Sequence, residues 1–279
     1  MKHDTLGEAG LSYAPCRYGT SRILFRGPRR PLDGRYIAFI GGTETYGRFI
    51  ENPFPALVEA ALGDVCVNFG MINASVDAFA NEPTVLAACH DARLNVVQVM
   101  GAQNLSNRFY TVHPRRNDRF LSASTVLRAI YPDVDFSDFC FTRHMLSTLY
   151  TRSPDRFEIV RLELEAAWLA RMTTFLNEIG KNTYLLWFAG HLPSDGRWDN
   201  RSSPFSADPL FVTRRMIDSL RQHVRGVVMV QPSARAIVGG TDGMFFSPMQ
   251  AIAAAETMSI LAHQEASAAL VGAIRATSS

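Results

Sequence analysis

The sequence has little of several features that would point at once to a class of function. Lysine occurs only at Lys2 and Lys181, which leaves 26 arginines among the 28 basic residues. Genome composition can produce such a bias, so it carries little functional weight. The formal net charge is only +2, which argues against a general nucleic-acid-binding surface. We therefore expect no nucleic-acid partner.

Paired cysteines are also absent. The four cysteines are far apart and form no Cys-x-x-Cys motif, so they indicate neither a zinc site nor a disulfide framework. We expect buried free thiols instead. No His, Asp or Glu cluster has the spacing of metal ligands, so the sequence predicts no metal and no cofactor. The cysteines are Cys16, Cys66, Cys89 and Cys140.

The chain lacks an apolar signal core near its N-terminus and any apolar run approaching 18 residues. We therefore expect a cytoplasmic protein without stable membrane insertion. Internal repeats and a convincing domain boundary are also lacking. The length of 279 residues suits one large domain. The sequence predicts an extended basic arm over residues 1–35, either a solvated lead-in or a flap that contacts anions, followed by one domain over 36–279.

The stretch 36–47 is the most informative part of the chain. The apolar run Tyr36–Ile40 breaks into Gly41 and Gly42, and amphipathic residues follow over 49–62. This order is typical of a buried strand, a tight turn and a helix. In open α/β sheets such a turn lies at the carboxyl edge, where ligands usually bind. A simple connection with a threonine cap is the alternative.

The same order recurs along the chain and predicts the fold class. Short apolar runs end in glycine at residues 63–70 and 94–100, and two more strands are expected at 182–189 and 227–230. Helical patterns separate them, which indicates right-handed βαβ units. The sequence therefore predicts an α/β/α sandwich with a mainly parallel sheet of about five strands. The main expected helices cover 49–62, 84–92, 154–178, 209–223 and 249–273.

A basic segment at 105–120 follows the third strand. Planar guanidinium groups suit bidentate binding of carboxylate or phosphate. Because the segment follows a strand end, it is expected to reach the same edge as Thr43 and to form an anion-binding lid. A solvated loop with internal Arg–Asp pairs is the alternative. The predicted anion-binding residues are Arg108, His113, Arg115, Arg116 and Arg119.

Four motifs in this order resemble those of the SGNH (GDSL-like) hydrolase superfamily. They lie at strand ends and span most of residues 36–262, and the remaining sequence resembles uncharacterised bacterial proteins. The resemblance implies an SGNH-hydrolase-like fold more securely than a reaction. The motifs are Gly41–Gly47, Asn68–Ser75, Gly101–Asn104 and Asp242–Phe246.

The departures from the family pattern bear on the chemistry. The resemblance places Thr43 where the family has its serine nucleophile, Gly42 where it has an acid, and Phe245 where it has its histidine. A hydroxyl needs an adjacent base, which phenylalanine cannot be, so standard esterase chemistry is not expected. His191, His113 or Glu44 are the candidate replacement bases. The expected oxyanion and substrate-binding groups are Gly42, Gly70, Asn73, Gln103 and Asn104.

Three functions remain open from the sequence. The first is a group-transfer enzyme that moves an acyl or sulfuryl group from a phosphate-bearing donor to the hydroxyl of a small molecule, lipid or glycan. The second is a hydrolase with a relocated base, in which Thr43 or water attacks an ester. The third is a catalytically inactive protein that binds an anionic metabolite or glycan. A homo-oligomer is compatible with each.

Overall fold

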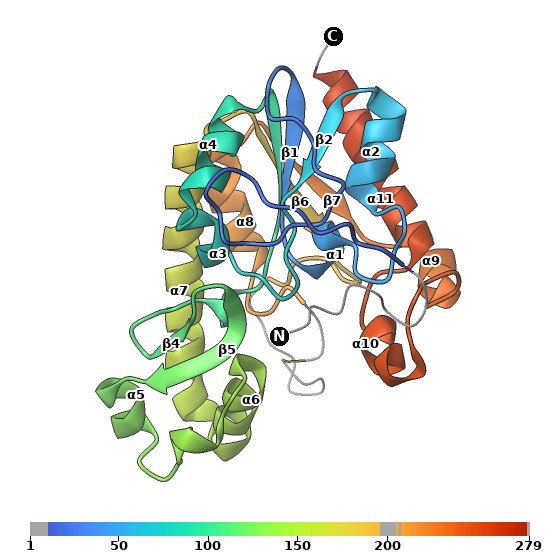
Figure 1. The fold of residues 1–279 in the computed structure, drawn as a ribbon. Coiled ribbons are helices and arrows are strands. Elements are labelled where there is room, and N and C mark those ends of the chain that lie inside the picture. Colours follow the sequence, from blue (N-terminus) through green and yellow to red (C-terminus); the bar gives the residue numbers. More distant parts are fainter. Residues whose placement is uncertain (1–10, 196–204, 206–207, 278–279) are drawn as a thin grey trace.

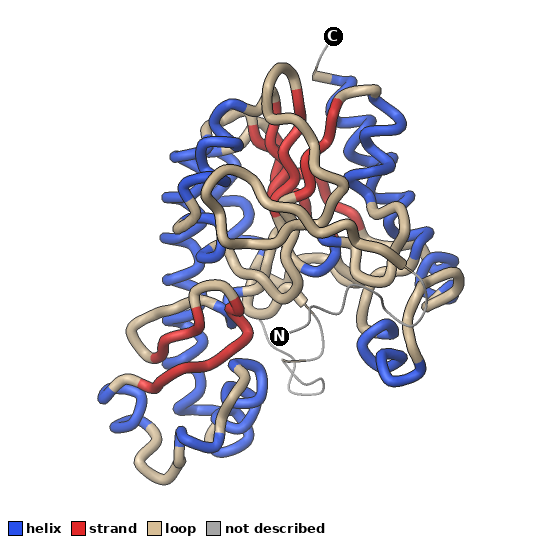
Figure 2. Tube along the Cα trace, in the orientation of Figure 1, coloured by secondary structure: helices blue, strands red, loops and turns tan. Residues whose placement is uncertain are grey.

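A parallel five-stranded sheet forms the centre of the computed structural model, which describes residues 11–195, 205 and 208–277. The strand order is β2-β1-β3-β6-β7, and each neighbouring pair is parallel. Figures 1 and 2 show the strands between two groups of helices. This confirms the predicted fold class. The strands are β1 (Tyr36–Ile40), β2 (Val65–Asn68), β3 (Leu94–Gln98), β6 (Thr183–Phe188) and β7 (Gly226–Val230).

Both faces of the sheet are covered, as expected for parallel strands. Alternate side chains of β1 enter two different cores: Ala38 packs with one cluster and Phe39 with the other. One core is closed by α3 (Asp77–Ala80), α4 (Pro83–Asp91), α7 (Pro154–Ile179) and α8 (Arg214–Leu220). The opposite core is closed by α2 (Phe54–Leu62), α9 (Ala234–Gly239) and α11 (Ile260–Ala276).

Capping residues set the limits of several helices. The Ser153 side chain accepts from the Arg156 amide and Pro154 occupies the first helical turn, so α7 starts where the sequence predicts. The predicted helix at 49–62 is wrong in its first part. A single turn, α1 (Thr43–Tyr46), follows β1, and α2 begins only after Pro53.

The predicted lid at 105–120 is wrong in its form. Residues from this segment make an antiparallel hairpin of β4 (Tyr110–His113) and β5 (Arg116–Ala123), with an irregular register near its turn. After the hairpin come α5 (Thr125–Ile130), the 3₁₀ turn η2 (Phe136–Asp138) and α6 (Thr142–Arg152). Together they form a lobe beside the first half of α7 (Figure 1).

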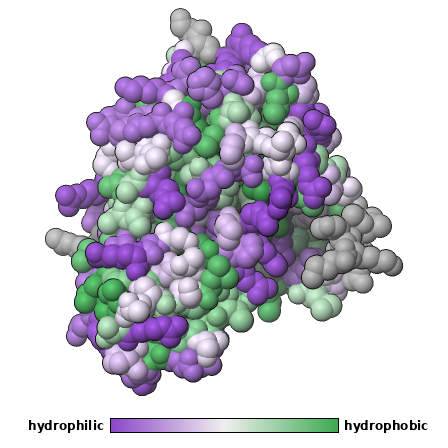
Figure 3. All heavy atoms as spheres, turned by 60° about the vertical axis from the view of Figure 1, so that its left-hand side comes forward, coloured by the Kyte–Doolittle hydropathy of each residue, from purple (hydrophilic) through white to green (hydrophobic). Residues whose placement is uncertain are grey.

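The outer surface of this lobe is mixed in polarity. Figure 3 shows hydrophobic residues among hydrophilic ones over the lower part of this side of the molecule. The exposed large apolar side chains of the lobe include Leu121, Val126 and Phe141.

The predicted helix at 249–273 is interrupted. It consists of the 3₁₀ turn η4 (Pro248–Gln250), α10 (Ala251–Ala255) and α11, and Ser259 caps α11 by accepting from the Ala262 amide. Two further 3₁₀ turns are η1 (Ala102–Asn104) and η3 (Arg221–His223). The expected surface loop at 193–209 lies largely outside the described residues.

The described part of the N-terminal arm, residues 11–35, packs on the domain. Its main anchor is Arg26, which is 6% exposed and donates to carbonyls at the end of α1 and in the loop after it: Tyr46, Gly47, Ile50 and Glu51. The Arg26 guanidinium also lies 5.1 Å from the Tyr13 ring centroid.

The cysteines are free thiols, but they are not all buried. Cys66 and Cys89 are buried, and burial raises the pKa of each thiol above its ordinary value. Cys140 is exposed, contrary to the expectation. In the described part of the chain, every helix is too short or too polar to cross a membrane.

Candidate functional site

The turn after β1 is held by a buried amide at the end of β3. The Gln98 side-chain oxygen accepts from the Gly42 amide at 3.2 Å, the Thr45 amide at 3.1 Å and the Thr45 hydroxyl at 2.6 Å. The Asn68 side chain, at the end of β2, donates to the Thr45 carbonyl at 2.6 Å. Side chains of the two flanking strands therefore fix the one-turn helix α1 at the carboxyl edge.

Close backbone packing also restricts which residue can occupy position 70, next to this turn. A Cβ on Gly70 would lie 2.2 Å from the Tyr46 nitrogen, so only glycine lets the β2 loop approach α1 this closely.

Asn73 joins the expected site residues of two loops. Its amide donates to the Thr43 hydroxyl at 3.1 Å, and the Thr43 hydroxyl lies 3.4 Å from the Asn73 side-chain oxygen. The Asn104 side chain donates to the Asn73 carbonyl at 3.1 Å. The Asn73 side chain also donates to the Asp118 carboxylate of β5 at 3.3 Å. We call Thr43, Asn73 and Asp118 the Asn73 cluster.

The cluster combines accessible and rigid parts. Asn73 is exposed, whereas Thr43 and Asp118 are partly exposed. Asn73 has a φ of 56°, in the left-handed region that asparagine tolerates better than most residues. Asn104 is buried, and its side-chain oxygen accepts from the Thr142 hydroxyl at 2.6 Å. The structure thus brings together Thr43, Asn73 and Asn104 at one edge of the sheet.

The groups expected to hold an oxyanion are engaged within the protein. The Gly42 amide donates to Gln98, and the Gly70 amide donates to the Asn68 side chain at 2.8 Å. Gln103 is buried and donates to the Asp208 carboxylate at 3.1 Å, so its amide turns toward the segment before α8. The Gln103 side-chain oxygen has no hydrogen-bond partner in the part of the chain that the structure describes.

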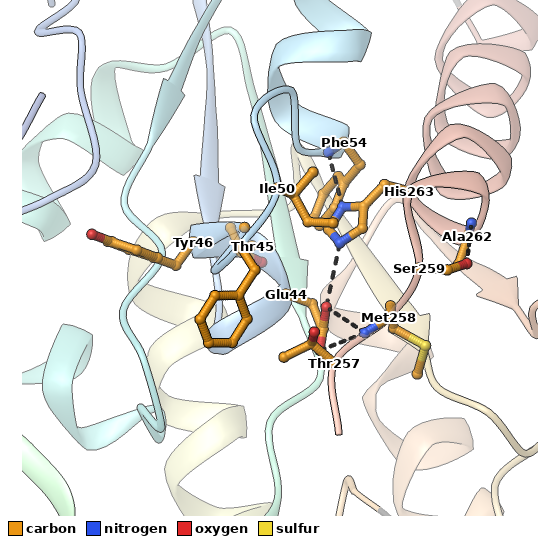
Figure 4. A network of polar contacts seen from close by, with 12 residues as sticks. Glu44, Thr45, Tyr46, Ile50, Phe54, Thr257, Met258, Ser259, Ala262 and His263 are labelled. Atoms are coloured by element: carbon orange, nitrogen blue, oxygen red, sulfur yellow. Dashed lines mark hydrogen bonds and ion pairs between the residues drawn. The ribbon is translucent and has the colours of Figure 1, made fainter. Parts of the chain in front are cut away.

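Glu44 has partners on the opposite side of α1. Its two carboxylate oxygens accept from the Met258 amide at 3.3 and 3.2 Å, and one of them lies 3.3 Å from Nε2 of His263 (Figure 4). His263 is fully buried, and its Nδ1 accepts from the Phe54 amide at 3.1 Å. These contacts tie Glu44 to α2 and α11, which favours a structural role over that of a base.

His191 follows β6 and has its own local contacts. Its Nδ1 donates to the Leu192 carbonyl at 2.9 Å, so in the neutral ring Nε2 carries the lone pair. That Nε2 atom is buried and has no hydrogen-bond partner among the described residues. Because β3 lies between β1 and β6, the ends of β1 and β6 are about 10 Å apart. His191 therefore borders the same sheet edge without a hydrogen bond to Thr43.

The predicted anion-binding residues divide into two groups. Arg108 pairs with Glu163 of α7 at 2.8 Å, and Arg119 lies 4.8 Å from the Phe141 ring centroid. Arg115 and Arg116 are exposed at the hairpin turn, and among the described residues neither has an ion pair. These two contacts thus run to residues outside the segment, and among the described residues no arginine of 105–120 forms the internal Arg–Asp pair of the alternative interpretation.

Hydrogen bonds stabilise the hairpin turn and connect the hairpin to the loop after β2. His113 accepts from the Arg115 amide at 3.2 Å, so its imidazole closes the turn. Buried Asn117 accepts from the Ser75 amide at 2.9 Å and the Ser75 hydroxyl at 3.0 Å. The hairpin is therefore fixed beside the Asn73 cluster.

A separate, open pocket is formed by residues of the N-terminal arm. It measures about 350 Å³ and is lined by residues 29–33 and Tyr18. Burial raises the pKa of Tyr18 to about 12, and its hydroxyl accepts from the Arg30 amide. Arg30 also pairs with Glu59. This pocket shares no residue with the Asn73 cluster.

Sequence reasoning missed four residues around the site: Gln98, Asp118, Thr142 and His263. Gln98 is a polar side chain at the end of a buried strand, which is a signal for a role at the sheet edge. Asp118 lay within the segment interpreted as basic, and its acidic charge received no separate role. Thr142 and His263 carry no local signal because their partners are distant in sequence.

The family of the chain is shown by a comparison with protein-family models. The model described as "Domain of unknown function (DUF6473)" matches residues 1–278. The chain belongs to this family. No curated protein matches this member of DUF6473.

Three solved structures show a distant similarity to the chain. One is the lipase Lip_vut3 from a goat rumen metagenome, with 14% identity and a TM-score of 0.37 over 86% of this chain and 96% of the other. An acetyl xylan esterase, Est2A, from Butyrivibrio proteoclasticus has 12% identity and a TM-score of 0.44 over 91% and 66%. A carbohydrate esterase family 2 enzyme with a carbohydrate-binding domain, from Corynascus thermopiles (Myceliophthora fergusii), has 12% identity and a TM-score of 0.38 over 88% and 69%. Similarities this distant support no inference about activity.

Proposed function

We propose that the Asn73 cluster binds a hydroxyl-bearing small molecule and supports transfer of an acyl or sulfuryl group to that hydroxyl. The observation that carries the proposal is the meeting of an alcohol, an amide and a carboxylate around Asn73. Such groups are the usual hydrogen-bonding partners of a ligand hydroxyl. Their fixed position at the carboxyl edge agrees with the usual place of ligands in open α/β sheets.

Asp118 is the proposed general base. Its carboxylate would take the proton of the ligand hydroxyl while that oxygen forms a bond to the acyl carbon or the sulfur. The bond from that atom to the donor breaks, and its electron pair leaves with the donor fragment. The Thr43 hydroxyl and the Asn73 side-chain amide would donate hydrogen bonds to the developing negative charge. This order of events needs no covalent intermediate on Thr43.

The phosphate-bearing donor is proposed to contact Arg115 and Arg116. Among the described residues they have no ion pair, unlike Arg108 with Glu163, so their guanidinium groups are available to an anion. Their place at the hairpin turn is next to Asn117, which contacts the β2 loop. The hairpin would thus bring the donor to the acceptor.

Hydrolysis through a Thr43 nucleophile is less well supported. In the described structure, the hydrogen bonds of the Thr43 hydroxyl are with Asn73. A threonine needs an adjacent base to become nucleophilic, and Glu44 instead contacts Met258 and His263. His191 as a base remains a prediction, and its buried Nε2 would have to become accessible to serve as one.

Binding without turnover is the second candidate. It is favoured by the engagement of the Gly42 and Gly70 amides, since an enzyme that stabilises an oxyanion needs free donors at the reacting atom. In that case the Asn73 cluster would hold a glycan or an anionic metabolite. Asp118 would then act only as a hydrogen-bond acceptor.

The proposal is tested by a thermal-shift screen with simple sugars, coenzyme A thioesters, nucleotide sulfate donors and nucleotide sugars. A ligand at 100 times its Kd stabilises the folded state by about 2.7 kcal/mol. We expect one acceptor and one donor class to raise the Tm. Asn73→Ala should abolish the acceptor shift, and Arg115→Ala with Arg116→Ala should abolish the donor shift.

An assay for group transfer between the acceptor and donor found in the screen then distinguishes the transferase from a protein that only binds. Asp118→Asn should retain acceptor binding and lose transfer, whereas the exposed control Asp138→Asn should keep both. Loss of turnover in His191→Ala but not in Asp118→Asn would move the base to His191. Binding of the acceptor with no product in the wild type would support the second candidate. A shift that Asn73→Ala leaves unchanged would contradict the site itself.

A further inference from the structure

His263 is a fully buried histidine with polar contacts on both sides of its ring. It lies in the first part of α11, and its ring stacks on Phe54 at 5.8 Å and meets the edge of Phe188 at 5.4 Å. Nδ1 accepts from the Phe54 amide, and Nε2 faces Glu44 (Figure 4). A buried polar ring among aromatic side chains costs stability unless its nitrogens are satisfied.

The Phe54 contact determines which ring nitrogen carries the proton. A backbone amide donates to Nδ1, so Nδ1 must present a lone pair. The proton of the neutral ring is then on Nε2, which points toward the Glu44 carboxylate. A second proton at Nδ1 would place two N–H donors against each other. The geometry therefore assigns a neutral imidazole whose Nε2–H faces the Glu44 carboxylate at 3.3 Å.

Among the residues that the structure describes, Glu44 is the one polar partner that this N–H faces. Nε2 is buried and has no fully formed hydrogen bond in the described structure, and the Glu44 oxygen at 3.3 Å is its one polar contact there. The same carboxylate accepts from the Met258 amide, at the break between α10 and α11. Glu44 thereby connects α1 with the beginnings of α2 and α11.

The contact on Glu44 completes the anchoring of α1. Gln98 and Asn68 hold Thr45, and Arg26 holds the Tyr46 carbonyl at 3.1 Å. Glu44 is held by His263 and Met258. Thr43 is the remaining residue of this turn, and its side chain faces the Asn73 loop.

We propose that His263 is a positioning residue for the Thr43 site, acting through Glu44; this inference rests on the proposed function of the Asn73 cluster. The neutral imidazole fixes the Glu44 side chain without adding a buried charge. Glu44 in turn fixes the orientation of α1 and the direction in which Thr43 presents its hydroxyl. Such fixed support makes a site precise.

Two amide substitutions separate the two sides of the ring. In His263→Gln the longer side chain can place an N–H near the former Nε2 and donate to Glu44. In His263→Asn the shorter side chain can face Phe54 but cannot reach Glu44. Leu270→Ala, a buried truncation on the same helix, is the control for loss of stability without loss of this contact.

The first measurement is nitrogen NMR of the His263 ring in the full-length protein, together with amide hydrogen exchange at Thr45 and Met258. We expect one protonated and one unprotonated ring nitrogen, with the proton on Nε2. Exchange at both amides should be at least about tenfold faster in His263→Asn than in Leu270→Ala, and His263→Gln should restore protection. A doubly protonated ring, or equal exchange in His263→Asn and Leu270→Ala, would overturn the proposal.

The second measurement is the Kd of the acceptor found in the screen, taken well below the Tm of each variant. His263→Asn should weaken binding by about tenfold relative to Leu270→Ala, with rescue by His263→Gln. Equal Kd values in the two variants would contradict the positioning role. If the wild type binds no acceptor, the proposed function fails, while the ring nitrogens and amide exchange still decide whether His263 positions α1.

Discussion

Gln98 accepts three hydrogen bonds through one side-chain oxygen, two of them from backbone amides of the β1 turn. Because Gln98 is 6% exposed, water cannot easily replace these bonds. The residue therefore connects the end of β3 to the turn that presents Thr43. The sequence gives it no motif, since its role depends on the parallel pairing of β1 with β3.

Replacing Gln98 should destabilise the fold. In Gln98→Leu the Gly42 and Thr45 amides lose their acceptor, and we expect the free energy of unfolding to fall by about 2–4 kcal/mol. Urea denaturation measures this change. The exposed residue Gln222 provides the control, because Gln222→Leu should change stability by less than about 0.5 kcal/mol. Equal effects of the two substitutions would show that the turn does not depend on Gln98.

Asp77 gives the protein a predictable pH dependence. Burial raises the pKa of this carboxyl, although Arg171 at 2.5 Å and the Ser106 amide partly oppose the change. A raised pKa in the folded state means that ionisation of Asp77 costs stability. The protonated Asp77 carboxyl therefore adds its full contribution to the free energy of unfolding below the unfolded pKa of about 3.9. This contribution is lost as pH rises through the folded pKa.

Asp77→Asn removes this proton-linked contribution. We expect the stability of the wild type relative to this variant to increase as pH falls from neutral toward 4, measured by urea denaturation at several pH values. Asp133 provides a comparison of opposite sign, because Arg156 and Arg152 hold its pKa well below the usual range. Asp133→Asn should lose stability relative to the wild type above pH 4, and the difference should shrink in more acidic solution. A pH-independent difference for Asp77→Asn would contradict the account.

At the scale of elements, the N-terminal arm and the hairpin hold the two loops that form the site. Arg26 fixes the end of α1 and the loop after it through four carbonyls, and Asn117 fixes the loop after β2 through Ser75. Burial lowers the pKa of the Arg26 guanidinium, which reflects the cost of removing a charge from water. That cost is offset by its carbonyl partners.

Arg26→Lys tests the arm directly. An ammonium keeps the charge but cannot reach all four carbonyls in the planar geometry of a guanidinium. We expect a loss of about 2–3 kcal/mol in the free energy of unfolding, measured by urea denaturation. Arg22→Lys, at an exposed position of the same arm, should be nearly neutral. Equal stability of the two variants would mean that the arm contributes little to the fold.

The elements also show which sequence signals were sufficient to locate strands and helices. Apolar runs ending in glycine or a polar residue located all five strands of the central sheet, because strands buried on both faces are mostly apolar. The hairpin was missed because β5 begins with polar and charged residues and its pairing with β4 has an irregular register. The break before α11 was missed because the alanine-rich sequence favours a continuous helix. In the structure, Ser259 instead caps a new helix and the Met258 amide bonds to Glu44.

At the scale of the whole molecule, the sequence predicted the edge of the sheet better than the chemistry on it. Thr43, Asn73 and Asn104 do meet, because parallel strands deliver their following loops to one edge. Asp118 and His263 could not be placed without the fold, since each contacts a residue far away in sequence. The roles of individual residues therefore depend on tertiary contacts more than on motifs.

The most direct test of the site is an amide chemical-shift map of the isotope-labelled protein, titrated with the acceptor found by the thermal-shift screen. The account predicts that the largest changes cluster at Thr43, Asn73, Asn104 and Asp118, with smaller changes at Thr45. Changes centred instead on Tyr18 and residues 29–33, which line the open pocket of the arm, would contradict the assignment of the functional site to the Asn73 cluster.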